Sequence, residues 1–218
     1  MTSKKLTVSL ILGVVLVAFA FGVYNYQRRV QNSQMEKVTA QQARLVRMHS
    51  TVFGPQAAPV TIVEFFDPAC ETCRAFYPVV KDILARHPQD VRLVIRYAPF
   101  HQGSDQVVRL LEASRRQNKY AVVLEAVLAA QPQWADHGRP NLAAAFQAAG
   151  QAGLDVARAI EDAQRPEVTA VLQQDVEDLT ALEVTRTPTF FVNGQGLPSF
   201  GRDQLLALVA QELAKVKR

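Results

Sequence analysis

The stretch VTIVEFFDPACETC, residues 60–73, decides the fold of this chain and contains both of its cysteines. Its first half, Val60–Phe66, is rich in β-branched and aromatic residues and has apolar side chains on both faces, which is typical of a strand buried within a sheet. The Asp-Pro-Ala segment 67–69 breaks this pattern, and apolar residues then recur at helical spacing as far as Arg86. We therefore expect a buried strand, a short loop and a helix that begins at the cysteine pair.

Cys70 and Cys73 lie three positions apart at the predicted start of this helix. A thiolate there is stabilised by unpaired backbone N–H groups and by the positive end of the helix dipole, so its pKa falls and its reactivity rises. Residues three apart on a helix have Cβ atoms about 5 to 6 Å apart, whereas a relaxed disulfide needs about 3.5 to 4.5 Å. The pair is therefore predicted to be a labile, redox-active dithiol in which Cys70 is the attacking sulfur.

Two other roles for the pair compete with redox chemistry. A zinc site needs about four ligands, and the four histidines are not paired at the spacing of metal ligands: His49, His87, His101 and His137. A structural disulfide across a loop of two residues would remove little entropy from the unfolded chain, because that stabilisation grows with loop length. Both alternatives are disfavoured relative to a redox-active pair.

The N-terminal residues 1–27 are predicted to form a membrane anchor. The run from Leu6 to Gln27 carries no charge and consists mostly of apolar residues, and about 20 such residues cross a bilayer core as a helix. Tyr24 and Tyr26 lie where an interfacial aromatic belt would fall. We expect one transmembrane helix, followed by a Gln-rich linker over residues 28–43.

A cleaved secretory signal is the alternative for the same segment. Lys4 and Lys5 form a basic start, and the small-x-small pattern 18–20 resembles a cleavage site. The apolar run continues beyond this pattern, which is long for a signal peptide. An uncleaved anchor is therefore favoured.

The orientation of the anchor is predicted from two opposing arguments. Two basic residues precede the segment and five follow it closely: Lys4 and Lys5, then Arg28, Arg29, Lys37, Arg44 and Arg47. This count would place the large domain in the cytosol. A short basic head before an apolar run is, however, how export signals begin, and an oxidising dithiol needs a compartment in which disulfides persist. We expect a single-pass protein of the inner membrane with its catalytic domain on the periplasmic side.

The composition is that of a globular protein with 49% hydrophobic and 20% charged residues in 218. The formal net charge is +4. No basic stripe is interleaved with aromatic residues, as a nucleic-acid-binding surface would require. We therefore expect no nucleic-acid partner.

The domain over residues 44–218 is predicted to be an α/β fold. A strand, a helix and a second strand at Val91–Tyr97 imply a right-handed parallel unit. Helix-capping signals at Asn141 and Asp155, stop signals at Gly150 and Gly153, and Pro166 in a first turn predict four or five inserted helices over about residues 104–184. The other expected elements are a first strand at 44–53, a third strand at 189–193, a turn at 193–196, a short strand at 197–200 and a final helix at 202–215.

Taken together, these features resemble the DsbA-like branch of the thioredoxin superfamily, the envelope thiol:disulfide interchange proteins, over roughly residues 46–216. The resemblance implies a thioredoxin-like fold with an inserted helical subdomain. It also implies an enzyme that forms, reduces or reshuffles disulfides in exported polypeptides. The resemblance is carried by these segments: 54–59, 60–65, 67–73, Pro78 and 187–194.

The resemblance assigns roles to individual residues. Cys70 would attack or be attacked in a mixed disulfide, and Cys73 would resolve it. Glu64 matches a buried acid of the family, and as the one charge in an apolar strand it should have a raised pKa suited to proton transfer; without the resemblance, an ordinary edge-strand glutamate is equally plausible. Pro188 matches a cis-proline that leaves a backbone edge free for an extended substrate.

Substrate-binding positions are expected at Thr187, Glu71 and Thr72, beside the cis-proline and between the cysteines. The Glu-Thr dipeptide departs from the strongly oxidising members, which carry a histidine there. Because a carboxylate at Glu71 opposes a negative sulfur, we expect a less depressed Cys70 pKa than in those members, and a weaker oxidant. Arg186 would either offset this charge or contact only solvent.

The predicted function is thiol:disulfide exchange without a metal or organic cofactor, the cysteine pair being the redox centre. Unfolded or extended proteins are the expected substrates. A quinone-linked membrane oxidase or a membrane electron donor is the expected redox partner, and the direction of exchange is left open. The alternative is a non-catalytic, membrane-tethered metal-handling or assembly module on the same fold.

Overall fold

The computed structural model describes residues 19, 21–29 and 39–216. The chain divides into two compact units, Met1–Ala43 and Arg44–Arg218. The described residues of the first unit are helical, and most of the predicted membrane segment 6–27 and of the linker 28–43 lies outside the described residues. Within the described part of the chain, no helix combines the length and the apolar character needed to span a membrane.

The second unit is built on a mixed sheet with the strand order β1-β3-β2-β4-β5. Its central strand β2 pairs in parallel with β3 and antiparallel with β4. The predicted parallel strand-helix-strand unit is therefore present, with β2 inside the sheet. The strands are β1 (Thr51–Phe53), β2 (Val60–Phe66), β3 (Val91–Tyr97), β4 (Thr189–Val192) and β5 (Gln195–Gly196).

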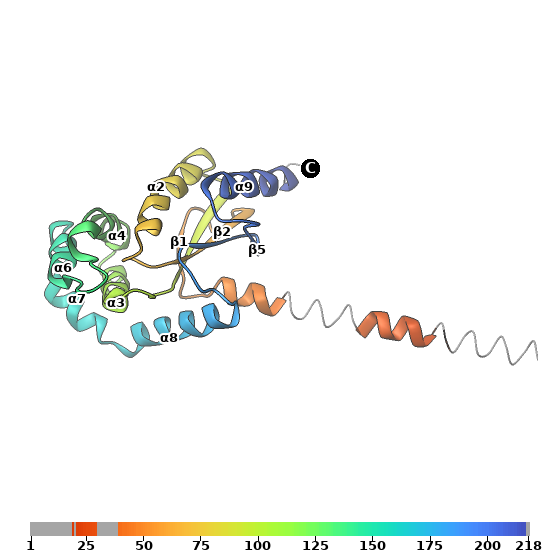
Figure 1. Cartoon of the computed structure of the whole chain (residues 1–218), viewed down its shortest axis with the longest axis horizontal. Coiled ribbons are helices and arrows are strands. Elements are labelled where there is room, and N and C mark those ends of the chain that lie inside the picture. The colour runs from red at the N-terminus through yellow and green to blue at the C-terminus, as the bar shows by residue number, and fades with distance from the viewer. Residues whose placement is uncertain (1–18, 20, 30–38, 217–218) are drawn as a thin grey trace, which may run out of the picture. The chain divides into compact units, whose positions relative to one another are not determined.

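Helices cover both faces of this sheet and extend it at one end. Helices α2 (Glu71–Arg86) and α9 (Arg202–Val216) lie on one side, and α8 (Pro166–Ala181) lies on the other (Figure 1). The remaining helices of the insertion between β3 and β4 pack together beyond the end of the sheet (Figure 1). They are α3 (Ser104–Arg115), α4 (Tyr120–Ala129), α5 (Gln131–Trp134), α6 (Leu142–Gln151) and α7 (Val156–Ala163).

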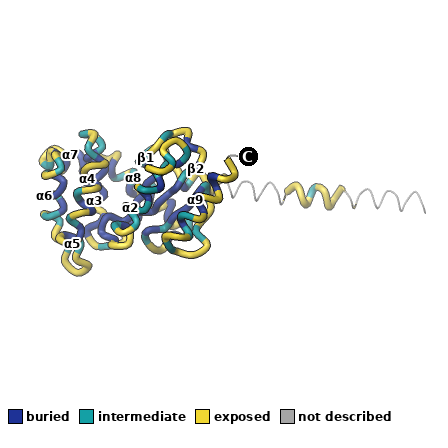
Figure 2. The backbone as a smooth tube through the Cα atoms, turned by 90° about the horizontal axis from the view of Figure 1, so that it is seen from above, coloured by how far each residue is buried: buried dark blue, intermediate teal, exposed yellow. Residues whose placement is uncertain are grey.

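Alternate residues of β2 belong to two different hydrophobic clusters. Ile62 and Phe66 contribute to the cluster that contains residues of α2, α9 and the insertion. Val63 and Phe65 contribute to the second cluster, which includes Leu179 of α8. Because side chains alternate along a strand, both faces of β2 are covered, which explains its continuous apolar run and its buried path in Figure 2.

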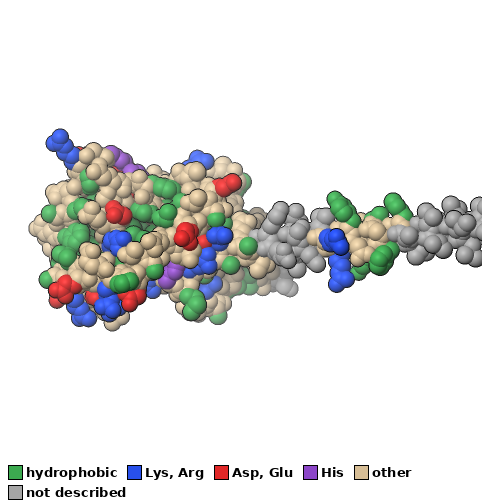
Figure 3. All heavy atoms as spheres, turned by 90° about the horizontal axis from the view of Figure 1, so that it is seen from below, with side chains coloured by type: hydrophobic (Ala, Val, Ile, Leu, Met, Phe, Trp, Pro, Cys, Tyr) green, Lys and Arg blue, Asp and Glu red, His purple; other side chains and the backbone are tan. Residues whose placement is uncertain are grey.

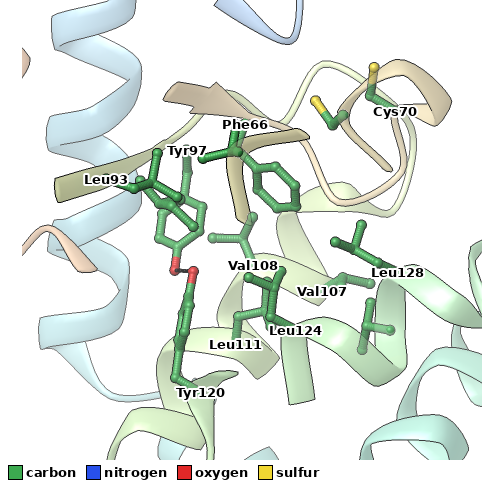
Figure 4. Close-up of a cluster of buried hydrophobic side chains, with 14 of the residues drawn as sticks. Phe66, Cys70, Leu93, Tyr97, Val107, Val108, Leu111, Tyr120, Leu124 and Leu128 are labelled. Carbon is green, nitrogen blue, oxygen red and sulfur yellow. Dashed lines mark hydrogen bonds between the residues drawn. The ribbon is translucent and has the colours of Figure 1, made fainter. Parts of the chain in front are cut away.

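The larger cluster joins the insertion to the sheet (Figure 4). Phe66 of β2 lies near Val108 and Leu124, and Cys70 lies at the edge of this group. The hydroxyls of Tyr97 and Tyr120 meet at 3.0 Å within it. The loop 67–70 between β2 and α2, called the redox loop below, is thus continuous with the core that holds the insertion in place.

Two predicted strands differ from the observed ones. The first strand was expected over 44–53 but spans only Thr51–Phe53, because residues 44 and 45 are helical and Arg44 and Arg47 form ion pairs with Asp178 of α8. The last strand was expected over 197–200 but is β5, Gln195–Gly196. Asn193 and Gly194 both have positive φ and form a two-residue hairpin turn, so pairing resumes earlier than predicted.

The helix signals of the insertion are mostly confirmed. Asn141 and Asp155 cap α6 and α7 by accepting hydrogen bonds from backbone N–H groups three residues later. Pro166 opens α8, and Gly153 follows α6 with a φ of +88°. The stop signal at Gly150 was wrong, since this glycine lies inside α6. The insertion also contains one short helix more than expected, because α5 is a four-residue turn.

Candidate active site

The cysteine pair lies where the end of β2 meets the start of α2. Cys70 is the N-cap residue of α2, and Cys73 is in its first turn. Both are free thiols and both are buried, with 6% of Cys70 and none of Cys73 exposed. The Cys70 N–H donates to the carbonyl oxygen of Asp67 at 3.1 Å, which closes the loop before the helix.

The surroundings of Cys70 stabilise its thiolate. Hydrogen bonding with Cys73 is the largest influence, and the Thr187 side chain and the backbone N–H groups of Cys73 and Thr72 add to it. Together they outweigh burial and lower the pKa of Cys70 to about 5. The protonated thiol donates instead to the Thr187 carbonyl oxygen at 3.3 Å.

Cys73 has the opposite character. Burial, the hydrogen bond with Cys70 and the charge of Glu64 all raise the pKa of the Cys73 thiol. The backbone N–H of Asp67 lies 3.5 Å from its sulfur. At neutral pH the reduced pair therefore carries one proton, on Cys73, and one negative charge, on Cys70.

Glu64 lies on the face of β2 that also carries Ile62 and Phe66, which is the face covered by α2. It is 2% exposed, and its Oε1 has no hydrogen-bond partner among the residues that the structure describes. Burial, helped by the negative charge of Cys70, raises the pKa of Glu64 to about 8. Because β2 is an inner strand, the edge-strand interpretation of this glutamate was wrong.

The segment before β4 completes the site. The Thr187–Pro188 peptide bond is cis, and Pro188 is buried while Thr187 is partly exposed. A groove of about 230 Å³ begins there and runs along the β4–β5 hairpin. Its lining residues are Arg186, Pro188, Thr189, Phe190, Gly196, Leu197, Pro198, Ser199 and Phe200.

The two residues between the cysteines have exposed side chains. The backbone N–H of Thr72 is one of the groups that stabilise the Cys70 thiolate. Glu71 lies 2.8 Å from Nε2 of His137, and its pKa is lowered, first by its own backbone N–H and then by His137. The ion-pair partner of Glu71 is thus His137, whereas Arg186 is exposed and lines the groove.

Asp67 is a site residue that the sequence did not reveal. Its carboxylate is completely buried. It accepts hydrogen bonds from the backbone N–H groups of Phe100 and His101, at 2.8 and 3.0 Å, and lies 2.7 Å from Nδ1 of His101. It therefore ties the redox loop to the loop that follows β3. Its position directly after a buried strand was the only available signal.

Gln131 of α5 is a second residue that sequence reasoning missed. Its side chain is buried and donates to the carbonyl oxygens of Pro68 and Cys70, at 2.8 and 3.0 Å. The insertion thus holds the backbone of the attacking cysteine directly. Nothing in the local sequence around this glutamine indicates the contact, because its partners lie more than 60 positions away.

The histidines are less scattered in space than in the sequence. The rings of His101 and His137 lie with their centroids 5.2 Å apart, close to the dithiol loop. Within residues 19, 21–29 and 39–216, no cluster of three or more His, Cys, Asp or Glu side chains is arranged to hold a metal ion.

A comparison with protein families matches residues 47–210 to the family described as Thioredoxin. Among solved structures, a thioredoxin-like oxidoreductase from Silicibacter pomeroyi DSS-3 is 30% identical, with a TM-score of 0.67 over 78% of this chain and 94% of that one. These two matches confirm the predicted thioredoxin-like α/β fold with a helical insertion.

Two more distant structures are similar in fold. The catalytic domain of Proteus mirabilis ScsC is 19% identical, with a TM-score of 0.68, and the match covers 82% of this chain and 98% of that one. The thiol-disulfide exchange protein alpha-DsbA2 from Wolbachia pipientis is 16% identical, with a TM-score of 0.68 over 83% and 96% of the two chains.

The curated relatives are longer proteins. The Na(+)/H(+) antiporter NhaA of Herminiimonas arsenicoxydans is 32% identical over 144 residues, which is 66% of this chain and 22% of the antiporter. NhaA 3 of Salinispora tropica is 33% identical over 147 residues, with the same coverage. The chain therefore spans about a fifth of the length of the curated relatives it matches.

Proposed function

Because the chain belongs to the thioredoxin family of thiol:disulfide oxidoreductases, we propose that it exchanges disulfides with extended polypeptides in the bacterial envelope through Cys70 and Cys73. The observation that carries this proposal is the position of Cys70. Its sulfur lies at the N-terminus of α2, beside the Thr187 carbonyl that precedes the cis-proline. A nucleophile and a backbone edge for the substrate thus lie next to each other.

In the reducing direction, the Cys70 thiolate attacks a substrate disulfide. A bond forms between Cys70 and one substrate sulfur, and the other substrate sulfur leaves as a thiolate and takes up a proton. The low pKa of Cys70 makes the attacking thiolate abundant at neutral pH.

The second step needs a base, because the Cys73 thiol is held protonated. Glu64 is the buried carboxyl group that acts on Cys73 electrostatically. As the proton of Cys73 passes to Glu64, the Cys73 sulfur attacks Cys70. The bond between Cys70 and the substrate breaks as the Cys70–Cys73 disulfide forms, and the second substrate sulfur leaves as a thiolate that takes up a proton from water. The oxidising direction is the reverse of these two steps.

Substrate binding is assigned to the surface around the dithiol. Thr187 and Pro188 supply the backbone edge beside Cys70, and the groove along the β4–β5 hairpin continues from it. Glu71 and Thr72 are exposed between the two sulfurs and would contact the polypeptide. An extended chain suits this site because its main chain can pair with a free backbone edge.

We place the catalytic domain on the periplasmic side of the inner membrane, tethered by residues 6–27. The uncharged apolar run of that segment supports the tether. The periplasmic side is supported by the dithiol itself, because an oxidising cysteine pair needs a compartment in which disulfides persist. A reporter fused after Arg218 tests this topology, since activity only in the cytosol would contradict it.

The redox partner follows from the direction of exchange. If the protein is an oxidase, a quinone-linked membrane protein reoxidises the dithiol; if it is a reductase or isomerase, a membrane electron donor reduces it. Thiol trapping in intact cells distinguishes them. A mostly oxidised pair indicates the first partner and a mostly reduced pair the second.

Cysteine variants of the full chain test the exchange reaction. Cys70→Ser should abolish insulin reduction, because the attacking thiolate is lost. Cys73→Ser should instead accumulate a mixed disulfide with the substrate, visible on a non-reducing gel, because the resolving sulfur is absent.

Equal activity in both variants and the wild type would contradict the proposal. Stoichiometric metal binding that depends on Cys70, without insulin reduction by the wild type, would instead support a metal-handling module.

A further inference from the structure

Two histidines from outside the dithiol segment meet over the redox loop. His101 lies in the loop between β3 and α3, and His137 lies between α5 and α6. Their ring centroids are 5.2 Å apart. The insertion thus delivers two titratable groups to one place, although 36 positions of sequence separate them.

His101 is held firmly in that place. Asp67 lies 2.7 Å from its Nδ1 and also accepts its backbone N–H. The same aspartate is bonded to both halves of the dithiol: its carbonyl accepts from the Cys70 N–H, and its own N–H lies against the Cys73 sulfur. His101, the backbone of Cys70 and the sulfur of Cys73 are therefore attached to a single buried residue.

His137 engages the acidic residue of the dithiol motif. Its Nε2 lies 2.8 Å from Oε1 of Glu71, the residue that directly follows Cys70. A free carboxylate at this position would repel a neighbouring thiolate. A hydrogen bond from Nε2 of His137 partly offsets that charge.

We propose that His101 and His137 form an electrostatic pair that controls the nucleophilicity of Cys70. The negative charges of Asp67, Cys70 and Glu71 favour the protonated form of His101, and His137 donates a hydrogen bond to Glu71. Both are positioning residues, since neither exchanges electrons or forms a bond with the substrate. This inference rests on the proposed role of Cys70 as the attacking thiol.

The charges around His101 are consistent with this role. Burial alone would lower the pKa of His101, but the bond and charge of Asp67, together with the charges of Cys70 and Glu71, outweigh it and raise the pKa. Three titratable groups face the two histidines: Asp67 from the loop after β2, and Cys70 and Glu71 from the start of α2. Two more act on Cys70 itself, namely Cys73 and Glu64.

The arrangement is reciprocal. The thiolate favours the protonated form of His101, so the protonated form of His101 must favour the thiolate to the same degree. Loss of the His101 proton should therefore lower the acid ionisation constant of Cys70.

The ionisation of Cys70 in the reduced full chain tests the pair, measured as the rate of alkylation against pH. His101→Gln removes the cation but keeps a polar group beside Asp67. The acid ionisation constant of Cys70 should fall roughly tenfold, as expected for loss of one nearby opposite charge. His101→Lys keeps a cation and should restore most of the ionisation constant while removing the pH step that belongs to the imidazole.

Two further variants keep the test decisive. His137→Gln changes a side chain that is 61% exposed, so the fold should tolerate it, and it should lower the ionisation constant roughly threefold by freeing the Glu71 charge. His87→Gln is the matched control, because His87 ends α2 about 24 Å from its start. It should leave the Cys70 ionisation unchanged.

A Cys70 ionisation constant that is the same in the wild type, His101→Gln and His137→Gln would overturn the inference. The same holds if His101→Lys behaves like His101→Gln. Failure of the proposed function looks different, because the wild type itself would then not reduce insulin, whatever the ionisation of its cysteine. A nuclear magnetic resonance titration of His101 gives a further readout, since Cys70→Ser should lower the pKa of this histidine.

Discussion

Glu64 and Cys70 are ordinary acids whose ionisation is changed in opposite directions by their surroundings. Cys70 receives hydrogen bonds at the start of a helix, which stabilise its charged form. Glu64 is buried within the sheet, and one of its oxygens has no hydrogen-bond partner among the described residues, which penalises its charged form. The two pKa values, about 5 and about 8, thus bracket neutral pH from the two sides. One group is then ready to attack, and the other is able to give or take a proton.

The raised pKa of Glu64 predicts a pH-dependent stability. Its folded pKa of about 8 lies above its ordinary value of 4.5. The folded state therefore binds the proton more tightly, and stability falls as pH rises from about 4.5 to 8. Glu64→Gln removes this loss. Its free energy of unfolding should exceed that of the wild type by about 5 kcal/mol above pH 8, and by little near pH 5.

Urea unfolding of the reduced protein at pH 5 and pH 8.5 measures this difference. Glu161→Gln is the matched control, because the same substitution is made on an exposed face of α7. It should change stability equally at both pH values. If Glu64→Gln showed the same pH dependence as the wild type, the carboxylate would not be the titrating group. The variant should also resolve mixed disulfides roughly 100-fold more slowly, the lower end for loss of general acid–base catalysis.

At the scale of the elements, a buried ionic network fastens the insertion to the sheet. Arg96 of β3 is fully buried and pairs with Asp175 and Asp178 of α8 at 2.7 and 2.8 Å. It also lies 5.6 Å from the ring centroid of Phe65. Burial acts against the charge of Asp178, but Arg47 and Arg96 outweigh it and lower its pKa. The network therefore links β3, α8 and the segment before β1.

Arg96→Met should destabilise the protein by about 3 to 5 kcal/mol, because it leaves two buried carboxylates without their shared cation. The midpoint of urea unfolding measures the loss. Arg202→Met, at the exposed start of α9, is the matched control and should change the free energy of unfolding by less than about 0.5 kcal/mol. Equal stability of the two variants would show that the network does not stabilise the fold.

The insertion and the dithiol are coupled through the same elements. Gln131 of α5 holds the Cys70 carbonyl, and the loop after β3 brings His101 to Asp67. Helix α8 anchors the other end of the insertion through Asp175, which accepts the Tyr97 N–H at 2.7 Å. The insertion is thus part of the catalytic architecture as well as a cover for the sheet.

For the whole molecule, the boundary between the two units falls at Ala43 and Arg44. Leu45 belongs to the smaller hydrophobic cluster and is 2% exposed, and Arg47 donates two hydrogen bonds to Asp178. Residues 44–50 therefore belong to the domain although they form no strand. Across one face of this unit, basic and acidic side chains are interspersed (Figure 3).

Two truncated proteins test this boundary. A protein that begins at residue 44 should unfold at the same urea concentration as the full chain. One that begins at residue 51 should lose several kcal/mol, since it lacks a buried leucine and three ion-pair partners of α8. Equal midpoints would show that residues 44–50 are only a linker.

The sequence alone determined those features of the site that depend on residues close together in the chain. The apolar run of β2, the break at Asp67 and the helical spacing after Cys70 place the two sulfurs at a helix N-terminus, because periodicity and capping act over a few neighbouring residues. Glu64 was found in the same way, as the single charge in that run. The α/β class and the position of the insertion followed from the order of such segments.

Only the tertiary structure decided which distant side chains surround the sulfurs. His101, His137 and Gln131 come to the dithiol through the packing of the insertion, and Arg96 meets α8 across 79 positions of sequence. A single sequence does not indicate such pairings, because capping and periodicity patterns are satisfied equally well by any polar residue in a loop. Arg186 was expected either to offset the charge of Glu71 or to contact only solvent, whereas the structure places Glu71 against His137, 66 positions away.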